Sequence, residues 1–297
     1  MFCLLHEASA GSIALGSIQG QDGWSGGTIA ISPSVDQEVT NAAAFAGTQS
    51  FRVSNNGFNG AYGGWIFGPG LTDAAGQPSS GATANRISLT LMFQSVSSSA
   101  DGSNLEIDLG DSNGTDRTTF TAITNYADAD GGLTLRAAEP DPTGNFFPTN
   151  AVATGLSRTT WHQLQIDGFF FDGPANDYFQ ISLDGGAPII SPNTSLNHWA
   201  TFEAFDAAVP QPYELANRIF MRSGAAPSSF VPSAVTASGF YFDNVSYQSW
   251  NSANPSTILS SYSTGFEDTS SAPEPGSVSM LALGLGALIR GVRPRRP

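Results

Sequence analysis

The chain has 297 residues, a net charge of −14 and only 12 % charged residues, whereas about 25 % is usual for a soluble domain. All eleven cations are arginines, and four of them lie in the last eight residues, which leaves seven against 25 acidic residues in the rest of the chain. An acidic surface of this kind repels phosphate backbones and excludes nucleic acid as a partner. A single cysteine, Cys3, excludes an intrachain disulfide.

The first ten residues resemble the end of a secretory signal peptide. Ala8-Ser9-Ala10 has the small-residue pattern of a cleavage site, but residues 1–7 lack a basic start and a full apolar stretch. We therefore expect residues 1–10 to be a remnant, with Met1 a misplaced start and the true signal peptide upstream. An in-frame stop codon a few codons before Met1 would contradict this.

Residues 11–250 are expected to form one all-β domain. Apolar and polar residues alternate in several short segments, and turn sequences such as Asp101-Gly102, Asn113-Gly114 and Asp184-Gly185 separate them. Only Ser195–Phe205 has the pattern of a helical turn. Many short strands with Gly-rich turns favour an antiparallel β-sandwich. The expected strands are Arg86–Gln94, Leu105–Leu109, Thr118–Ile123, Leu133–Arg136, Gln163–Ile166, Phe179–Leu183 and Phe240–Tyr247.

Three short motifs sharpen this expectation: Trp161-His162, a strand ending in Asp184-Gly185, and Phe242-Asp243-Asn244-Val245. Together they resemble concanavalin A-like (laminin G-like) jelly-roll domains. The resemblance implies two curved antiparallel sheets whose concave face or rim loops bind carbohydrate, sometimes beside calcium. Trp24, Trp161 and Trp250 are expected in the core.

The segment 105–111 carries the candidate catalytic residues. In a strand, Glu106 and Asp108 lie on one face while Ile107 and Leu109 point into the core, and a bulge would bring Asp111 to the first face. The segment resembles the catalytic strand of laminarinase-type glycoside hydrolases, which implies Glu106 as nucleophile, Asp108 as supporting carboxylate and Asp111 as acid. Asp111 is shorter than the Glu of that motif. We therefore expect a solvent-exposed acidic strand face, and predict that the chain is not an enzyme.

Two further ligand sites are candidates. Asp111, Asn113 and Asp116 place oxygens around a Gly turn, as calcium prefers, although ordinary Asx turns give the same pattern. Calcium is the one cofactor that the sequence indicates. In the Gly- and Asn-rich segment 55–70, expected to be a loop, exposed aromatic rings would suit the apolar faces of sugars; the alternative is that they cap the core. These aromatic residues are Phe58, Tyr62, Trp65 and Phe67.

The C-terminus has the most specific pattern. After an expected flexible linker, residues 251–272, come Pro273-Glu274-Pro275, the apolar run Val278–Ile289 and an arginine cluster. This order resembles PEP-CTERM sorting signals. The apolar run, expected to be a short helix, spans about 18 Å against about 30 Å of hydrocarbon, which favours transient insertion in the inner membrane. The arginines, which fit the positive-inside bias, are Arg290, Arg293, Arg295 and Arg296.

The resemblance implies export, processing by an exosortase, and delivery to the cell surface or extracellular matrix of a Gram-negative bacterium. We therefore expect a surface or matrix protein with a non-catalytic, polysaccharide-binding sandwich. The alternatives are a glycoside hydrolase built on Glu106, Asp108 and Asp111, and a purely structural matrix component.

Overall fold

The computed structural model describes residues 11–26, 35–55, 65–72, 84–110, 121–125, 130–140, 146–169, 178–190, 217–223, 237–251 and 257–268. The chain divides into two units, Met1–Glu267 and Asp268–Pro297, and of the second only Asp268 is described. The described residues contain no α-helix, and none of their segments is a helix long and apolar enough to cross a bilayer. The predicted helical turn at 195–205, the remnant at 1–10 and the sorting signal at 273–297 lie outside the described residues.

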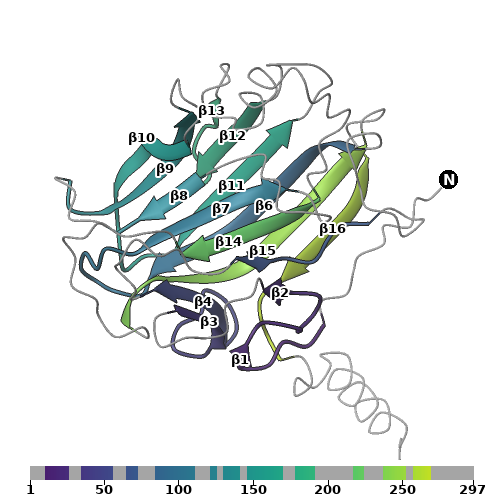
Figure 1. The fold of residues 1–297 in the computed structure, drawn as a ribbon, viewed down its shortest axis with the longest axis horizontal. Helices are drawn as coiled ribbons and strands as arrows, with labels where there is room; N and C mark the ends of the chain where they lie inside the picture. The colour runs from purple at the N-terminus through teal and green to yellow at the C-terminus, as the bar shows by residue number, and fades with distance from the viewer. Residues whose placement is uncertain are drawn as a thin grey trace, which may run out of the picture. The chain divides into compact units, whose positions relative to one another are not determined.

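Two antiparallel sheets form the first unit, as the sequence predicted (Figure 1). The larger sheet has the order β1-β3-β4-β15-β6-β11-β12-β13, and β16 also pairs with β15. Its strands are β1 (Gly16–Ser17), β3 (Val35–Thr40), β4 (Ser50–Asn55), β6 (Ala84–Ser95), β11 (His162–Phe169), β12 (Tyr178–Leu183), β13 (Ile189–Ile190), β15 (Phe240–Asn251) and β16 (Ile258–Thr264).

The smaller sheet has seven strands in the order β10-β9-β8-β7-β14-β5-β2. All described pairings in both sheets are antiparallel. The architecture is therefore that of a jelly-roll sandwich. The strands of this sheet are β2 (Ser25–Gly26), β5 (Ile66–Phe67), β7 (Asn104–Gly110), β8 (Thr121–Thr124), β9 (Leu133–Pro140), β10 (Phe146–Leu156) and β14 (Arg218–Ser223).

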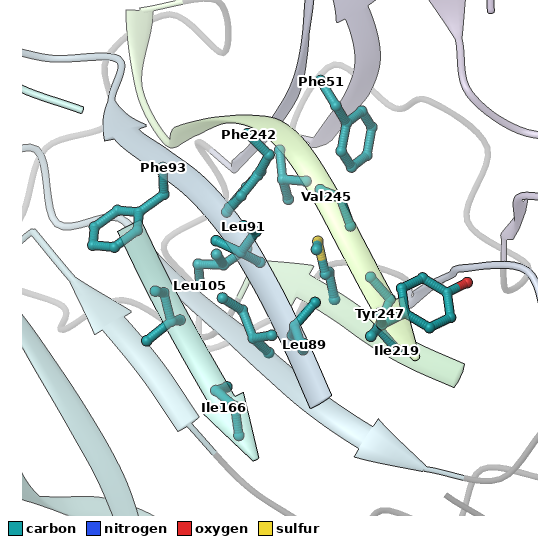
Figure 2. Close-up of a cluster of buried hydrophobic side chains, with 14 of the residues drawn as sticks. Phe51, Leu89, Leu91, Phe93, Leu105, Ile166, Ile219, Phe242, Val245 and Tyr247 are labelled. Carbon is teal, nitrogen blue, oxygen red and sulfur yellow. The ribbon is translucent and has the colours of Figure 1, made fainter. Parts of the chain in front are cut away.

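The core lies between the two sheets and is built from every second residue of their central strands (Figure 2). β6 contributes Leu89, Leu91 and Phe93, which belong to one buried cluster with Leu105 of β7 and Ile219 of β14. Because strand side chains alternate between faces, the residues between these point away from the core. Each sheet therefore presents a second face, and the candidate sites lie there.

One end of the core is aromatic. Trp24 packs against Phe51 and Phe266 with ring centres 5.8 Å away in each case, and its Nε1 donates a 2.8 Å hydrogen bond to the Tyr262 hydroxyl. That hydroxyl donates in turn to Asp22 Oδ2 at 2.8 Å, and burial is the main cause that raises the pKa of Tyr262. Trp24 is fully buried, as predicted.

The last strand corrects the predicted linker. Residues 251–272 were expected to be a flexible connection, but Ile258–Thr264 form β16, which pairs with β15 from Val245 to Trp250. Phe266 is fully buried, and Glu267 O accepts a 3.1 Å hydrogen bond from the N–H of Ile13. The sandwich therefore extends to Glu267, because the Tyr262 and Phe266 side chains are part of its core.

Candidate functional site

The face of β7 that points away from the core carries Glu106 and Asp108, as the alternation predicted. Leu105, Ile107 and Leu109 belong to the core cluster, so the two carboxylates lie on the opposite face of the strand. They are not the solvent-exposed acidic face that was expected, since Glu106 is 2 % and Asp108 0 % exposed. Burying a carboxylate is costly unless it is paired, so we expect the neighbouring strand to supply a partner for these carboxylates.

The adjacent strand β14 supplies a cation directly opposite Glu106. The register pairs Arg222 with Glu106 and Phe220 with Asp108, and Arg222 Nε donates to Glu106 Oε2. The same guanidinium lies 4.2 Å from the ring centre of Trp65. Arg222 therefore joins a buried carboxylate to a partly exposed indole.

A second arginine of β14 lies among aromatic rings. The Arg218 guanidinium is 4.5 Å from the ring centre of Phe67 and 4.8 Å from that of Phe220. The two rings meet edge to face at 5.1 Å, and Trp65 meets Phe220 edge to face at 6.0 Å. Aromatic faces hold a guanidinium by cation–π attraction and keep it oriented.

Further along the sheet, Arg136 of β9 lies on this face too. The register places Arg136 opposite Ala122 of β8, which is opposite Glu106, and Arg136 Nε lies 3.4 Å from Thr124 Oγ1. We call the whole set the charged face; it consists of Trp65, Phe67, Glu106, Asp108, Arg136, Arg218, Phe220 and Arg222. Three of the seven arginines that precede the C-terminal cluster therefore lie on one face of one sheet.

The structure brings together two groups of residues that the sequence predicted separately. The carboxylates Glu106 and Asp108 come from the candidate catalytic strand. Trp65 and Phe67 belong to the aromatic residues of segment 55–70 that were predicted to bind sugars. Phe67 lies in the short strand β5, not in a loop, and β5 pairs with β14. The remaining candidates, which lie outside the described residues, are Phe58, Tyr62, Asp111, Asn113 and Asp116.

The arginines of the charged face were missed from the sequence, although a signal for two of them exists. Residues 218–222, Arg-Ile-Phe-Met-Arg, are three apolar residues between two arginines, and the spacing of four residues places both arginines on the same face of a strand. No grouping of three or more His, Cys, Asp or Glu side chains occurs in the described part of the chain, so calcium stays a prediction from the sequence.

Comparison with known proteins finds only distant likenesses to solved structures. No protein-family profile and no curated protein sequence matches the chain. Among solved structures it is similar to the cellulose-induced protein Cip1 (10 % identity, TM-score 0.41, covering 79 % of this chain and 96 % of that chain). It is also similar to an alginate lyase from Corynebacterium sp. (13 %, 0.39, 76 % and 84 %) and to lectin II from Ulex europaeus (11 %, 0.38, 76 % and 94 %). At identities and TM-scores this low, the likeness does not assign a function.

One prediction is corrected by these matches. Alginate lyases recur among them, and alginate lyases are enzymes. This finding contradicts the prediction that the chain is not an enzyme, although it assigns no activity to the chain. The prediction rested on the departure of Asp111 from one hydrolase motif and did not consider other kinds of catalysis.

Proposed function

We propose that this chain binds a polysaccharide on the charged face of its seven-stranded sheet. The observation that carries the proposal is the contact of Arg222 with both Glu106 and Trp65. A sugar ring has an apolar face that packs on an indole or phenyl ring, and its hydroxyls bond to guanidinium groups. Trp65, Phe67 and the arginines beside them offer these partners along neighbouring strands.

Catalysis on the same face is the second candidate, and one observation favours it. Glu106 and Asp108 are two residues apart on one strand, so their backbones are separated by about 6.6–6.8 Å. In the laminarinase-type strand the nucleophile and the supporting carboxylate have this two-residue spacing, whereas the carboxyl groups that stand about 5–5.5 Å apart in a retaining enzyme are those of the nucleophile and the acid. Arg222 Nε donates to Glu106 Oε2, and a nucleophilic carboxylate must be oriented by such a partner. In this hypothesis Asp108 supports Glu106, and the acid is Asp111.

The export of the protein is proposed from its sequence alone. We infer that residues 273–297 direct an exosortase to the chain and bring the sandwich to the cell surface or matrix. A polysaccharide would be abundant there, which supports placing the binding site on the sandwich.

Binding is tested with the full chain and a matched pair of tryptophan variants. Trp65→Ala removes an indole that lies against Arg222 on the charged face, and Trp250→Ala removes an indole 4.9 Å from Arg86 on the other sheet. Affinity electrophoresis in alginate, laminarin, agarose and cellulose derivatives measures binding. We expect Trp65→Ala to weaken binding about tenfold, a loss of about 1.4 kcal/mol, and Trp250→Ala to leave it unchanged. Equal effects of the two variants, or no retardation in any gel, would overturn the proposal.

Cleavage is tested on the same polysaccharides with two readouts. Hydrolysis releases reducing ends, whereas β-elimination gives an unsaturated uronate that absorbs in the ultraviolet. Glu106→Gln keeps the shape of the side chain and removes its charge, so it should abolish hydrolysis, and thermal unfolding checks that this variant is folded. Hydrolysis that survives Glu106→Gln would exclude Glu106 as nucleophile.

A further inference from the structure

The other sheet carries a hollow on the face that points away from the core. It has a volume of about 520 Å³ and is lined by Phe45, Thr90, Met92, Gln163, Asp184, Gly185 and Asn244. Thr90 and Met92 come from β6, Gln163 from β11, and Asp184 and Gly185 from the turn that follows β12. The two outer faces of a sandwich are separated by its core, so this hollow is distinct from the charged face.

An exposed aromatic ring stands at this hollow. Phe45 is 48 % exposed, and its ring meets Trp161 edge to face at 6.0 Å. Trp161, which was predicted to be a core residue, is only half-buried. A large exposed phenyl ring is costly in water, and one that faces a hollow is available to a ligand.

The position of Phe45 is fixed by the chain around it. Asp243, which is fully buried, accepts hydrogen bonds from the N–H groups of Phe45 and Ala46 at 2.8 and 3.0 Å. Glu267 accepts the N–H groups of Thr48 and Gln49 at 2.8 and 3.0 Å. The segment that carries the Phe45 ring is therefore held by hydrogen bonds at two points, so little conformational entropy is lost when a ligand binds the ring.

The remaining lining is polar and carries no cation among the described residues. Gln163 and Asn244 are exposed amides, Thr90 has a hydroxyl, and Met92 is the buried apolar residue of the set. Asp184 accepts from the N–H of Gln163 at 2.8 Å and lies 2.7 Å from His162 Nδ1. Amides and hydroxyls pair with hydroxyl groups, whereas a carboxylate without a cation in the lining opposes an anion.

We propose that this hollow is a second saccharide site, and that it takes an uncharged sugar. The volume lies within the range of about 300–1,000 Å³ that is usual for small-molecule sites. Phe45 covers the apolar face of the sugar ring, Gln163 and Asn244 bond to its hydroxyls, and Met92 lies beneath. This site goes beyond the proposed function and does not depend on it.

The test is calorimetric titration of the full chain with maltose, cellobiose, mannobiose and chitobiose. At least one of these disaccharides should bind, and Phe45→Ala should weaken its binding at least about tenfold. Gln163→Ala should weaken it about threefold to tenfold, in line with one lost hydrogen bond. The matched control is Ile189→Ala, which removes another exposed apolar side chain, 41 % exposed on β13, and should leave binding unchanged.

The outcomes separate the two sites. Loss of binding in Phe45→Ala with normal binding in Trp65→Ala supports the hollow. Absence of binding to all four disaccharides, or equal binding by Phe45→Ala and Ile189→Ala, overturns this inference and leaves the proposed function untouched. Since Phe45 and Ile189 are both exposed, thermal unfolding of the two variants should match the wild type, and this measurement checks that the chain is folded.

Discussion

Replacing Arg222 with alanine would leave the Glu106 carboxylate buried without the guanidinium that now binds it. The Glu106 side chain is 2 % exposed and that of Arg222 is 17 % exposed, so solvent screens this pair poorly. Removing one partner of a buried pair typically costs about 3–5 kcal/mol. We therefore expect Arg222→Ala to lower the free energy of unfolding by about that amount.

The same reasoning predicts the opposite result when both partners are replaced. The double variant Glu106→Leu with Arg222→Met removes both charges and fills the space with apolar groups. Such replacements are often neutral or stabilising. The free energy of unfolding of the double variant should therefore equal or exceed that of the wild type. Glu106→Leu alone would leave the guanidinium without this carboxylate and should fall between the two.

Urea unfolding followed by tryptophan fluorescence and by circular dichroism measures Arg222→Ala and the double-mutant cycle of wild type, Glu106→Leu, Arg222→Met and the double variant. The reasoning requires a large positive coupling energy between the two positions. A loss of less than about 1 kcal/mol in Arg222→Ala, which is the range of exposed pairs, would show that Glu106 is solvated and that the charged face is not built as described.

Two further predictions concern the body of the sandwich. Gly239 has φ +94°, and a Cβ there would lie 2.3 Å from a backbone carbonyl oxygen of β4, whereas Gly185 has φ +70° and open space around it. Gly239→Ala should therefore lower the free energy of unfolding in urea by about 1–3 kcal/mol more than Gly185→Ala does. Equal losses in the two variants would refute the clash. Burial raises the pKa of Asp101 from 3.8, against the effect of its hydrogen bonds with Ser103. The folded protein then binds more protons than the unfolded chain just above pH 3.8, so the contribution of Asp101 to stability is present below that pH and is lost as the pH rises through the raised value. Relative to Asp101→Asn, the wild type should be more stable near pH 4 than at pH 7, and a constant difference between the two proteins across this range would contradict the shift.

Seven of the sixteen strands that the structure describes were predicted from the sequence, because one face of each is buried. Polar and apolar residues alternate in Arg86–Gln94 with the single exception of Met92, and β6 contains the whole segment. The long strand β10 was missed because Pro148 and Gly155 interrupt its pattern, and its pairing with β9 contains three register shifts. The short strand β5 has too few residues for any periodicity.

The candidate site was predicted only in parts, for a different reason. Strand alternation is local and places Glu106 and Asp108 on one face without any tertiary information. Arg222 lies 116 residues from Glu106 in the chain, and Trp65 reaches the same place through the pairing of β5 with β14. Which strands become neighbours is decided by the topology of the sheet, and a local pattern does not contain it.

The position of β15 has a consequence for the order in which the molecule can be assembled. This strand lies in the middle of the larger sheet, between β4 and β6, yet it is among the last to leave the ribosome. Until residues 240–251 exist, β1-β3-β4 and β6-β11-β12-β13 are two ribbons with open edges and no hydrogen-bonded link. A nascent chain of high contact order folds slowly. This chain would therefore stay unfolded, and able to pass through a membrane channel, until its synthesis is nearly complete.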